Sequence, residues 1–171
     1  TFGIYAGGNG GATATDAPTA IASVTTNTAP SGTTINNLSV TNNAINACAR
    51  GVVFNGAAAT VAATALTISN NLFGTTAVLG SFPFTTPTTT VYTKGVWVNG
   101  ATAVAINGNS FQNILSYVAT TMTCIELAGA MGTGNKSFDN NTINGLANNG
   151  TSGCTGILIS SNGGGTYTMS G

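Results

Sequence analysis

Histidine is absent from this chain of 171 residues, and charged side chains are scarce, with three Lys or Arg and three Asp or Glu. Without histidine the chain cannot form a Ser-His-Asp triad, and a histidine-ligated zinc site is excluded as well. The formal net charge is zero, which makes nucleic acid a poor partner because phosphate binding needs several cations. Helices of a globular protein need a charged solvent face, so an all-α fold is disfavoured too.

Long apolar runs are missing as well, and none approaches the roughly 18 residues of a membrane-spanning helix. We therefore expect no insertion into a membrane. The three cysteines are too few and too irregularly spaced for a metal site, so we expect neither a metal nor a cofactor. Lysine is nearly absent, which suggests a protein that works in an extracellular or cell-surface setting.

What the chain does contain is an internal repeat with two alternating frames. In the first frame an apolar anchor is followed three residues later by asparagine and five residues later by a second apolar residue. Alternation along a strand turns the anchors inward and their neighbours outward. The copies of this frame span residues 38–45, 66–73, 104–111 and 136–143, and a partial fifth copy begins at Tyr167.

The asparagines of the first frame recur at one position, as Asn43, Asn71, Asn109 and Asn141. If successive repeats stack at the strand spacing of about 4.8 Å, their amides form an internal ladder of hydrogen bonds. Asparagine also tolerates the left-handed backbone that a tight corner needs. The sequence therefore predicts a structural asparagine ladder.

The second frame is a glycine followed by alternating apolar residues, and it alternates strictly with the first, so each repeat holds at least two strands. Its outward column is unusual, because four of its five side chains are large and apolar. Such a stripe is typical of a contact surface for a ligand or partner, unless other segments of the chain cover it. The frame begins at Gly3, Gly51, Gly95, Cys124 and Gly156, and the outward column is Tyr5, Val53, Trp97, Glu126 and Leu158.

The spacing between copies varies, from 28 residues between Val40 and Ile68 to 38 between Ile68 and Ile106. Constant strand cores with variable spacing are typical of a solenoid whose corners absorb insertions. We predict insertions at about residues 7–34 and 75–94 within a single segment, residues 1–171, that belongs to a longer chain or assembly.

This pattern resembles the parallel β-helix repeats of the pectin-lyase-like superfamily, which carry an asparagine ladder at one corner. The resemblance covers the chain except the two insertions. It implies an all-β fold, namely a right-handed parallel β-helix (β-solenoid) of about five coils. The low-charge composition is also similar in style to secreted surface proteins of Bacteroidota-type bacteria.

For enzymes of that superfamily the resemblance implies clustered aspartates, or an Arg or Lys base beside acid-bound calcium. Glycoside hydrolysis needs two carboxyl groups about 5–9.5 Å apart. Here no two of Asp16, Glu126 and Asp139 occupy equivalent positions on neighbouring repeats. Arg50 and Lys94 precede equivalent glycines, so they either grip a uronate carboxylate together or are solvated corner charges. We expect no enzyme activity.

Cys124 and Cys154 lie near equivalent corners of adjacent repeats, which permits a disulfide. The alternative is that these two and Cys48 are three small buried thiols.

The expected function is that of a non-catalytic extracellular structural or adhesive β-solenoid module, part of a surface fibre or large cell-surface protein. Solenoids need caps, and the terminal repeats show none, so we expect self-association or continuation of the solenoid at both ends. One alternative is a polysaccharide-binding or polysaccharide-cleaving, lyase-like β-helix with a glycan partner. A second is an ice-binding solenoid, since Ser39/Thr41 and Thr67/Ser69 form outward hydroxyl pairs.

Overall fold

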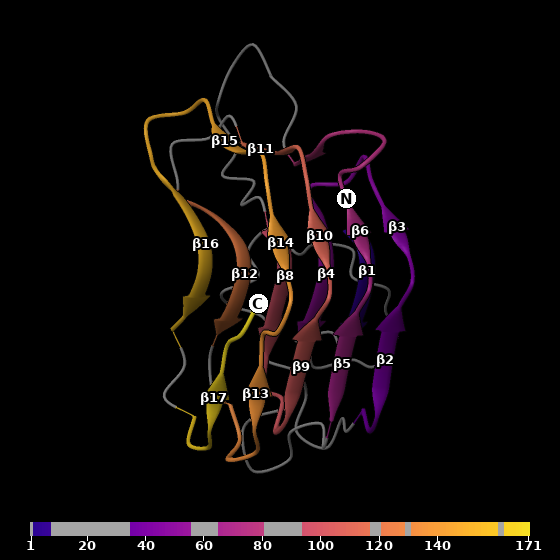
Figure 1. Ribbon diagram of the computed structural model, residues 1–171, viewed down its shortest axis with the longest axis vertical. Coiled ribbons are helices and arrows are strands. Elements are labelled where there is room, and N and C mark those ends of the chain that lie inside the picture. Colours follow the sequence, from indigo (N-terminus) through magenta and orange to yellow (C-terminus); the bar gives the residue numbers. More distant parts are fainter. Residues whose placement is uncertain are drawn as a thin grey trace, which may run out of the picture.

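A computed structural model describes residues 2–7, 35–55, 65–80, 94–116, 121–128, 131–160 and 163–171. These residues form strands and turns without any helix, so this part of the chain holds no helix able to cross a membrane. All strand pairs are parallel, as the repeat predicted, and each links one repeat to the next (Figure 1). The all-β class is confirmed.

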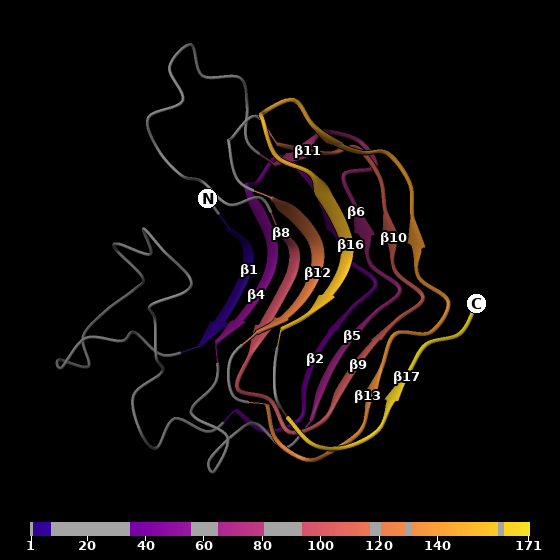
Figure 2. The same ribbon diagram turned by 90° about the vertical axis from the view of Figure 1, so that its left-hand side faces the viewer.

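The two frames of the repeat build the two largest sheets, which we name A and B. Both contain five strands, and they run side by side along the stack (Figure 2). Sheet A contains β1 (Phe2–Gly7), β4 (Arg50–Asn55), β8 (Lys94–Asn99), β12 (Met122–Ala128) and β16 (Cys154–Ile159), and sheet B contains β2 (Leu38–Thr41), β5 (Leu66–Ser69), β9 (Val104–Asn107), β13 (Lys136–Ser137) and β17 (Tyr167–Thr168).

Two smaller sheets, C and D, lie between sheet B and sheet A along the chain. In the repeats that begin at β5, β9 and β13 the chain passes through sheets B, C, D and A in turn, whereas the repeat that begins at β2 has no described strand in sheet D. This arrangement is consistent with a solenoid. Sheet C contains β3 (Ala44–Ile45), β6 (Leu72–Phe73), β10 (Ser110–Phe111) and β14 (Thr142–Ile143), and sheet D contains β7 (Leu79–Gly80), β11 (Ile114–Ser116) and β15 (Leu146–Asn148).

The register of both large sheets follows the two frames. In sheet B, Val40 pairs with Ile68, and Ile68 pairs with Ile106. In sheet A the column that begins at Ile4 continues through Val52 and three further strands. The inward side chains of a middle strand therefore lie between side chains of the repeats on both sides, and in the columns of Ile4 and Val40 the paired side chains are all apolar.

The predicted second insertion starts too early. Residues 79–80 form β7, which pairs with β11 through Leu79 and Ile114, and Lys94 already belongs to β8. A two-residue strand is too short to show alternation, so the only signal for β7 was the apolar pair Val78 and Leu79 after a run of Thr and Ala. Of the first predicted insertion, Gly7 belongs to β1 and residues 8–34 lie outside the described residues.

The core is the space enclosed by the four sheets, and it is filled by the inward columns. Phe73 and Phe111 stack there with their ring centroids 4.5 Å apart. Burial of each large apolar side chain contributes about 1.5–3 kcal/mol. The glycines that open the second frame let neighbouring strands approach closely: a Cβ on Gly95 would lie 2.7 Å from the Cys124 carbonyl oxygen.

Candidate functional site

The asparagine column is a continuous chain of hydrogen bonds through the interior. The backbone N–H and Nδ2 of Asn71 both donate to Oδ1 of Asn109, at 3.0 Å each. Asn43 donates to Asn71 in the same way, and Asn109 donates to Asn141. The Nδ2 of Asn71 also donates to the Val40 carbonyl of the preceding repeat, at 2.8 Å. Asn71 and Asn109 are both buried, and each amide bonds to the repeats on both sides.

The left-handed corner lies one residue before the ladder. Asn42, Asn70 and Asn140 have φ angles of 57°, 55° and 55°, and Gly108 has the same role with 66°. The ladder asparagines are absent from the residues with positive φ. The tolerance of asparagine for this backbone therefore accounts for the residue before the ladder, whereas the ladder residues act through their amides.

The outward column of sheet A is aligned across all five strands, since Tyr5 pairs with Val53, Val53 with Trp97, and so on to Leu158. It is not an open stripe, however. Val53 and Trp97 are buried, with Trp97 3% exposed, and Tyr5 and Ala128 pack against them in a cluster separate from the main core. Only Leu158 at the end of the column is well exposed, at 37%. The two predicted insertions, at about residues 7–34 and 75–94, are the segments that could supply a cover, and residues 8–34 and 81–93 of them lie outside the described residues.

The fourth member of this column, Glu126, forms an ion pair with Lys94 of the neighbouring strand β8, and both side chains are mostly buried. Arg50 pairs with Lys94 in register and is itself buried. The two cations are therefore aligned, but they are not solvated corner charges. Lys94 already has a carboxylate partner, so it is not left open for a uronate. Sequence analysis missed this pair because it considered Glu126 as a member of the outward column and as a possible catalytic carboxylate, and did not ask which cation lies on the neighbouring strand.

The carboxylates of the described residues do not gather at one place. Asp139 follows β13, which lies between β9 and β17 in sheet B, and its Oδ1 accepts a 2.8 Å hydrogen bond from the Ser170 hydroxyl. Glu126 lies in sheet A, and Asp16 lies outside the described residues. The residues described here also contain no cluster of three His, Cys, Asp or Glu side chains that could hold a metal ion.

Lys136 is a buried cation that sequence analysis did not single out. It occupies the inward column of sheet B between Val104 and Tyr167. Its ammonium donates to the carbonyls of Gly132 and Gly164, and lies 5.3 Å from the centre of the Tyr167 ring. Burial lowers the pKa of this ammonium below its usual value. A lysine in a column otherwise filled by Leu, Val and Tyr was the signal that could have revealed it.

The predicted disulfide between Cys124 and Cys154 is wrong, because all three cysteines are free. Cys154 pairs in register with Met122, so the two thiols are offset by two residues along their strands. Cys124 and Cys48 are buried, as the alternative proposed, but Cys154 is exposed.

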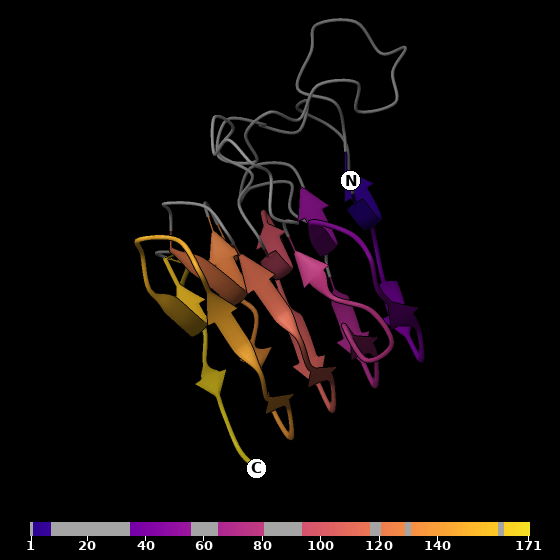
Figure 3. The same cartoon turned by 90° about the horizontal axis from the view of Figure 1, so that it is seen from above.

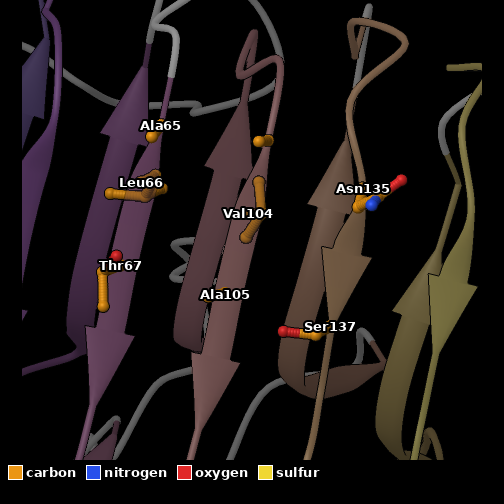
Figure 4. A pocket seen from close by; sticks show the side chains of 8 residues that line it. Ala65, Leu66, Thr67, Val104, Ala105, Asn135 and Ser137 are labelled. Atoms are coloured by element: carbon orange, nitrogen blue, oxygen red, sulfur yellow. The ribbon is translucent and has the colours of Figure 1, made fainter.

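The outer face of sheet B carries a shallow hollow of about 210 Å³ (Figure 4). Thr67, Ala105 and Ser137 line it from three neighbouring strands, with Asn135 at one side. No charged residue is among the eight that line it. The hydroxyl pairs of β2 and β5 are aligned here, but Ala105 and Asn107 interrupt the array at β9.

No protein-family model, curated protein or solved structure matches this chain. The function is therefore argued from the geometry alone.

Proposed function

We propose that this chain is a right-handed parallel β-helix of about five coils, of the pectin-lyase-like kind, and that it serves as a non-catalytic structural or adhesive module outside the cell. The module would belong to a surface fibre or a large cell-surface protein. It works through its stacked shape and its faces.

One observation carries the proposal: both described carboxylates are engaged by other side chains, and they belong to different sheets. Glu126 is paired with Lys94 on sheet A, and Asp139, which follows β13 of sheet B, accepts a hydrogen bond from Ser170. Polysaccharide hydrolysis needs two carboxyl groups about 5–9.5 Å apart on one groove. A lyase of this kind would need a free cationic base, and Lys94 has a carboxylate partner. These partners argue against hydrolase and lyase chemistry, and the regular stack of strands remains as the feature through which the module would act.

Two measurements test the proposal, one on the purified chain and one on intact cells. The first is incubation with a panel of uronate-containing and neutral polysaccharides, followed by detection of unsaturated or reducing ends. We expect no product. The second is surface labelling of intact cells of the producing organism, which we expect to modify the chain. Product formation that is abolished by Arg50→Ala and by Lys94→Ala, but kept by the outward control Thr67→Ala, would establish the lyase alternative instead.

A further inference from the structure

Two corners of the stack join sheet C to sheet D through only two residues each. Gln112 and Asn113 join β10 to β11, and Asn144 and Gly145 join β14 to β15 one repeat later. The pairing of the flanking strands places Asn144 beside Gln112 and Gly145 beside Asn113. The chain leaves β14 for the second corner at the top of Figure 1, the side from which Figure 3 views the stack. The two corners therefore occupy equivalent positions and differ in their side chains.

The backbone of the second corner favours glycine at position 145. Its φ is 79°, in the left-handed region, and a Cβ there would lie 3.2 Å from the backbone nitrogen of Asn113. The fold therefore places a residue without a side chain directly after Asn144. In an Asn-Gly pair, the backbone nitrogen of the glycine can approach the asparagine side chain with the least steric hindrance.

The two groups that could react with each other are open at this corner. Asn144 and Gly145 are both exposed. The backbone N–H of Asn144 donates to the Phe111 carbonyl at 2.8 Å, and the carbonyl of Gly145 accepts from the Ile114 N–H at 3.1 Å. Neither the side-chain amide of Asn144 nor the N–H of Gly145 has a hydrogen-bond partner among the described residues.

The corner one repeat earlier shows that a following repeat leaves these groups open. The strands that flank Gln112 and Asn113 are paired with β14 and β15 of the next repeat. Even so, the Gln112 amide donates within its own repeat, to the Ser110 hydroxyl at 3.2 Å. The Asn113 N–H has no partner within the described part of the chain. The openness of the Asn144 corner therefore comes from the corner itself and not from where the sequence stops.

We propose that Asn144 is a site of self-modification, at which asparagine becomes aspartate or isoaspartate through a cyclic imide. The backbone nitrogen of Gly145 gives its proton to a base in the solvent and attacks Cγ of Asn144. A C–N bond forms, and the side-chain nitrogen takes up a proton and leaves as ammonia. Water then opens the imide at one of its two carbonyls, which leaves a carboxyl group at residue 144. Water is the only co-reactant.

The pair Asn107 and Gly108 has the same residue types but is held by hydrogen bonds. The side-chain oxygen of Asn107 accepts from the Asp139 N–H at 2.8 Å, and its Nδ2 donates to the Ser137 hydroxyl at 3.0 Å. The Gly108 N–H donates to the Asp139 carbonyl at 2.9 Å. Both reacting groups would have to break these bonds first, so this pair should react slowly.

The other two Asn-Gly pairs of the described residues are also hindered. The Gly150 N–H, which follows Asn149, donates to Oδ1 of Asn148 at 2.9 Å. Asn99 already has an interaction partner, and Gly100 is buried. Among these four pairs, only Asn144 and Gly145 leave both the amide and the attacking N–H open at an exposed corner.

The modification changes the corner in two ways. A carboxyl group at residue 144 is ionised at neutral pH, so the formal net charge falls from zero to minus one. Isoaspartate also lengthens the main chain between the N–H that donates to the Phe111 carbonyl and the carbonyl that accepts from the Ile114 N–H. It therefore disturbs two bonds that hold this repeat to the preceding one, whereas aspartate leaves the main chain unchanged.

Peptide mapping by mass spectrometry, after storage of the folded full chain in mildly alkaline buffer, tests the proposal. Digestion with pepsin in acid limits modification during handling, and electron-transfer fragmentation distinguishes isoaspartate from aspartate. We expect Asn144 to react faster than Asn107 by about tenfold or more, because the hydrogen bonds of Asn107 must open first. Mapping resolves each asparagine separately, so the Asn-Gly pairs that lie wholly or partly outside the described residues do not enter the comparison.

Unfolded chain in urea is the control for the fold, and there Asn99, Asn107, Asn144 and Asn149 should react at similar rates. Asn144→Gln is the matched variant, because glutamine occupies the equivalent position in the preceding corner. It keeps an amide but needs a larger ring to close, so modification at residue 144 should be lost.

Faster reaction at Asn107 or Asn149 than at Asn144 in the folded chain would overturn the proposal. It would also be overturned if Asn144 stayed intact in the folded chain while the chain in urea was modified there. Neither result bears on the proposed function, which the polysaccharide and surface-labelling measurements test separately.

Discussion

The middle of the stack and its β16/β17 end contain similar side chains in different surroundings. Leu127 and Ile159 occupy one inward column of sheet A, yet Leu127 is fully buried and Ile159 is well exposed. Trp97 and Leu158 show the same contrast in the outward column. The residue type is apolar in each case, so burial depends on whether neighbouring repeats pack on both sides. Substitutions at a middle position and at an end position of one column therefore measure how much the neighbouring repeats add to the free energy of unfolding at each position.

The largest contrast is expected in the outward column of sheet A. Trp97→Ala removes a buried indole and should lower the free energy of unfolding by about 3–5 kcal/mol. Leu158→Ala, in the same column, should cost less than about 1 kcal/mol because the side chain is already partly in water. Urea denaturation followed by circular dichroism measures both. Equal costs would show that Trp97 is a surface residue in solution.

The inward column should give a similar contrast of slightly smaller size. Leu127→Ala leaves a cavity among packed neighbours, and we expect a loss of about 2–5 kcal/mol. Ile159→Ala removes a similar side chain at the exposed end and should cost less than about 1 kcal/mol in the monomer. Denaturation at low protein concentration keeps self-association out of the comparison. A large effect of Ile159→Ala under those conditions would mean that something covers this end.

The asparagine ladder should show a moderate effect that depends on hydrogen bonding rather than on volume. Asn109→Ala removes the amide oxygen that accepts from the backbone N–H and Nδ2 of Asn71, and it removes the Nδ2 donor to Asn141, at a cost of about 1–3 kcal/mol. Thr67→Ala, outward on sheet B, should be close to neutral. Thermal denaturation of the two variants decides this. If Thr67→Ala costs as much as Asn109→Ala, the ladder bonds contribute no more than an outward hydroxyl.

The smallest expected effect is a dependence on alkaline pH that arises from the buried thiol of Cys124. Burial raises the pKa of this thiol above its ordinary value of 9.0. The folded state therefore keeps the proton where the unfolded chain loses it, so this contribution to stability is intact below pH 9.0 and declines as pH rises above it.

The lowered pKa of Lys136 acts in the opposite direction. The unfolded chain binds its proton more tightly, so stability from this group rises as pH approaches 10.5. The difference between wild type and Cys124→Ala isolates the thiol. We expect the free energy of unfolding to fall more steeply above pH 9.0 in the wild type than in Cys124→Ala. Cys154→Ala, at an exposed cysteine, is the control, and identical slopes for all three proteins would contradict this explanation.

The repeat frames predicted the strands of sheets A and B because alternation is a local property with a period of two residues. The same pattern could not reveal sheet D, since β7 has only two residues and a single apolar side chain, Leu79. It also misplaced Cys154, because a two-residue offset between strands is invisible without the register. The ammonium of Lys136 donates to backbone carbonyls of two different repeats. Every residue has a backbone carbonyl, so the sequence could not indicate which ones would be its partners.

The sequence by itself determined which residues share a column. Each copy of a frame has the same order of residues, and this order sets which side chains of a strand point inward and which point outward. Only the tertiary structure decided what surrounds each column. Trp97 is buried, Glu126 meets Lys94, and Met169 is exposed. The physical reason is that a strand in the stack pairs with strands 28 to 48 residues away in the sequence. Burial and charge pairing depend on those distant neighbours, whereas alternation depends only on adjacent residues.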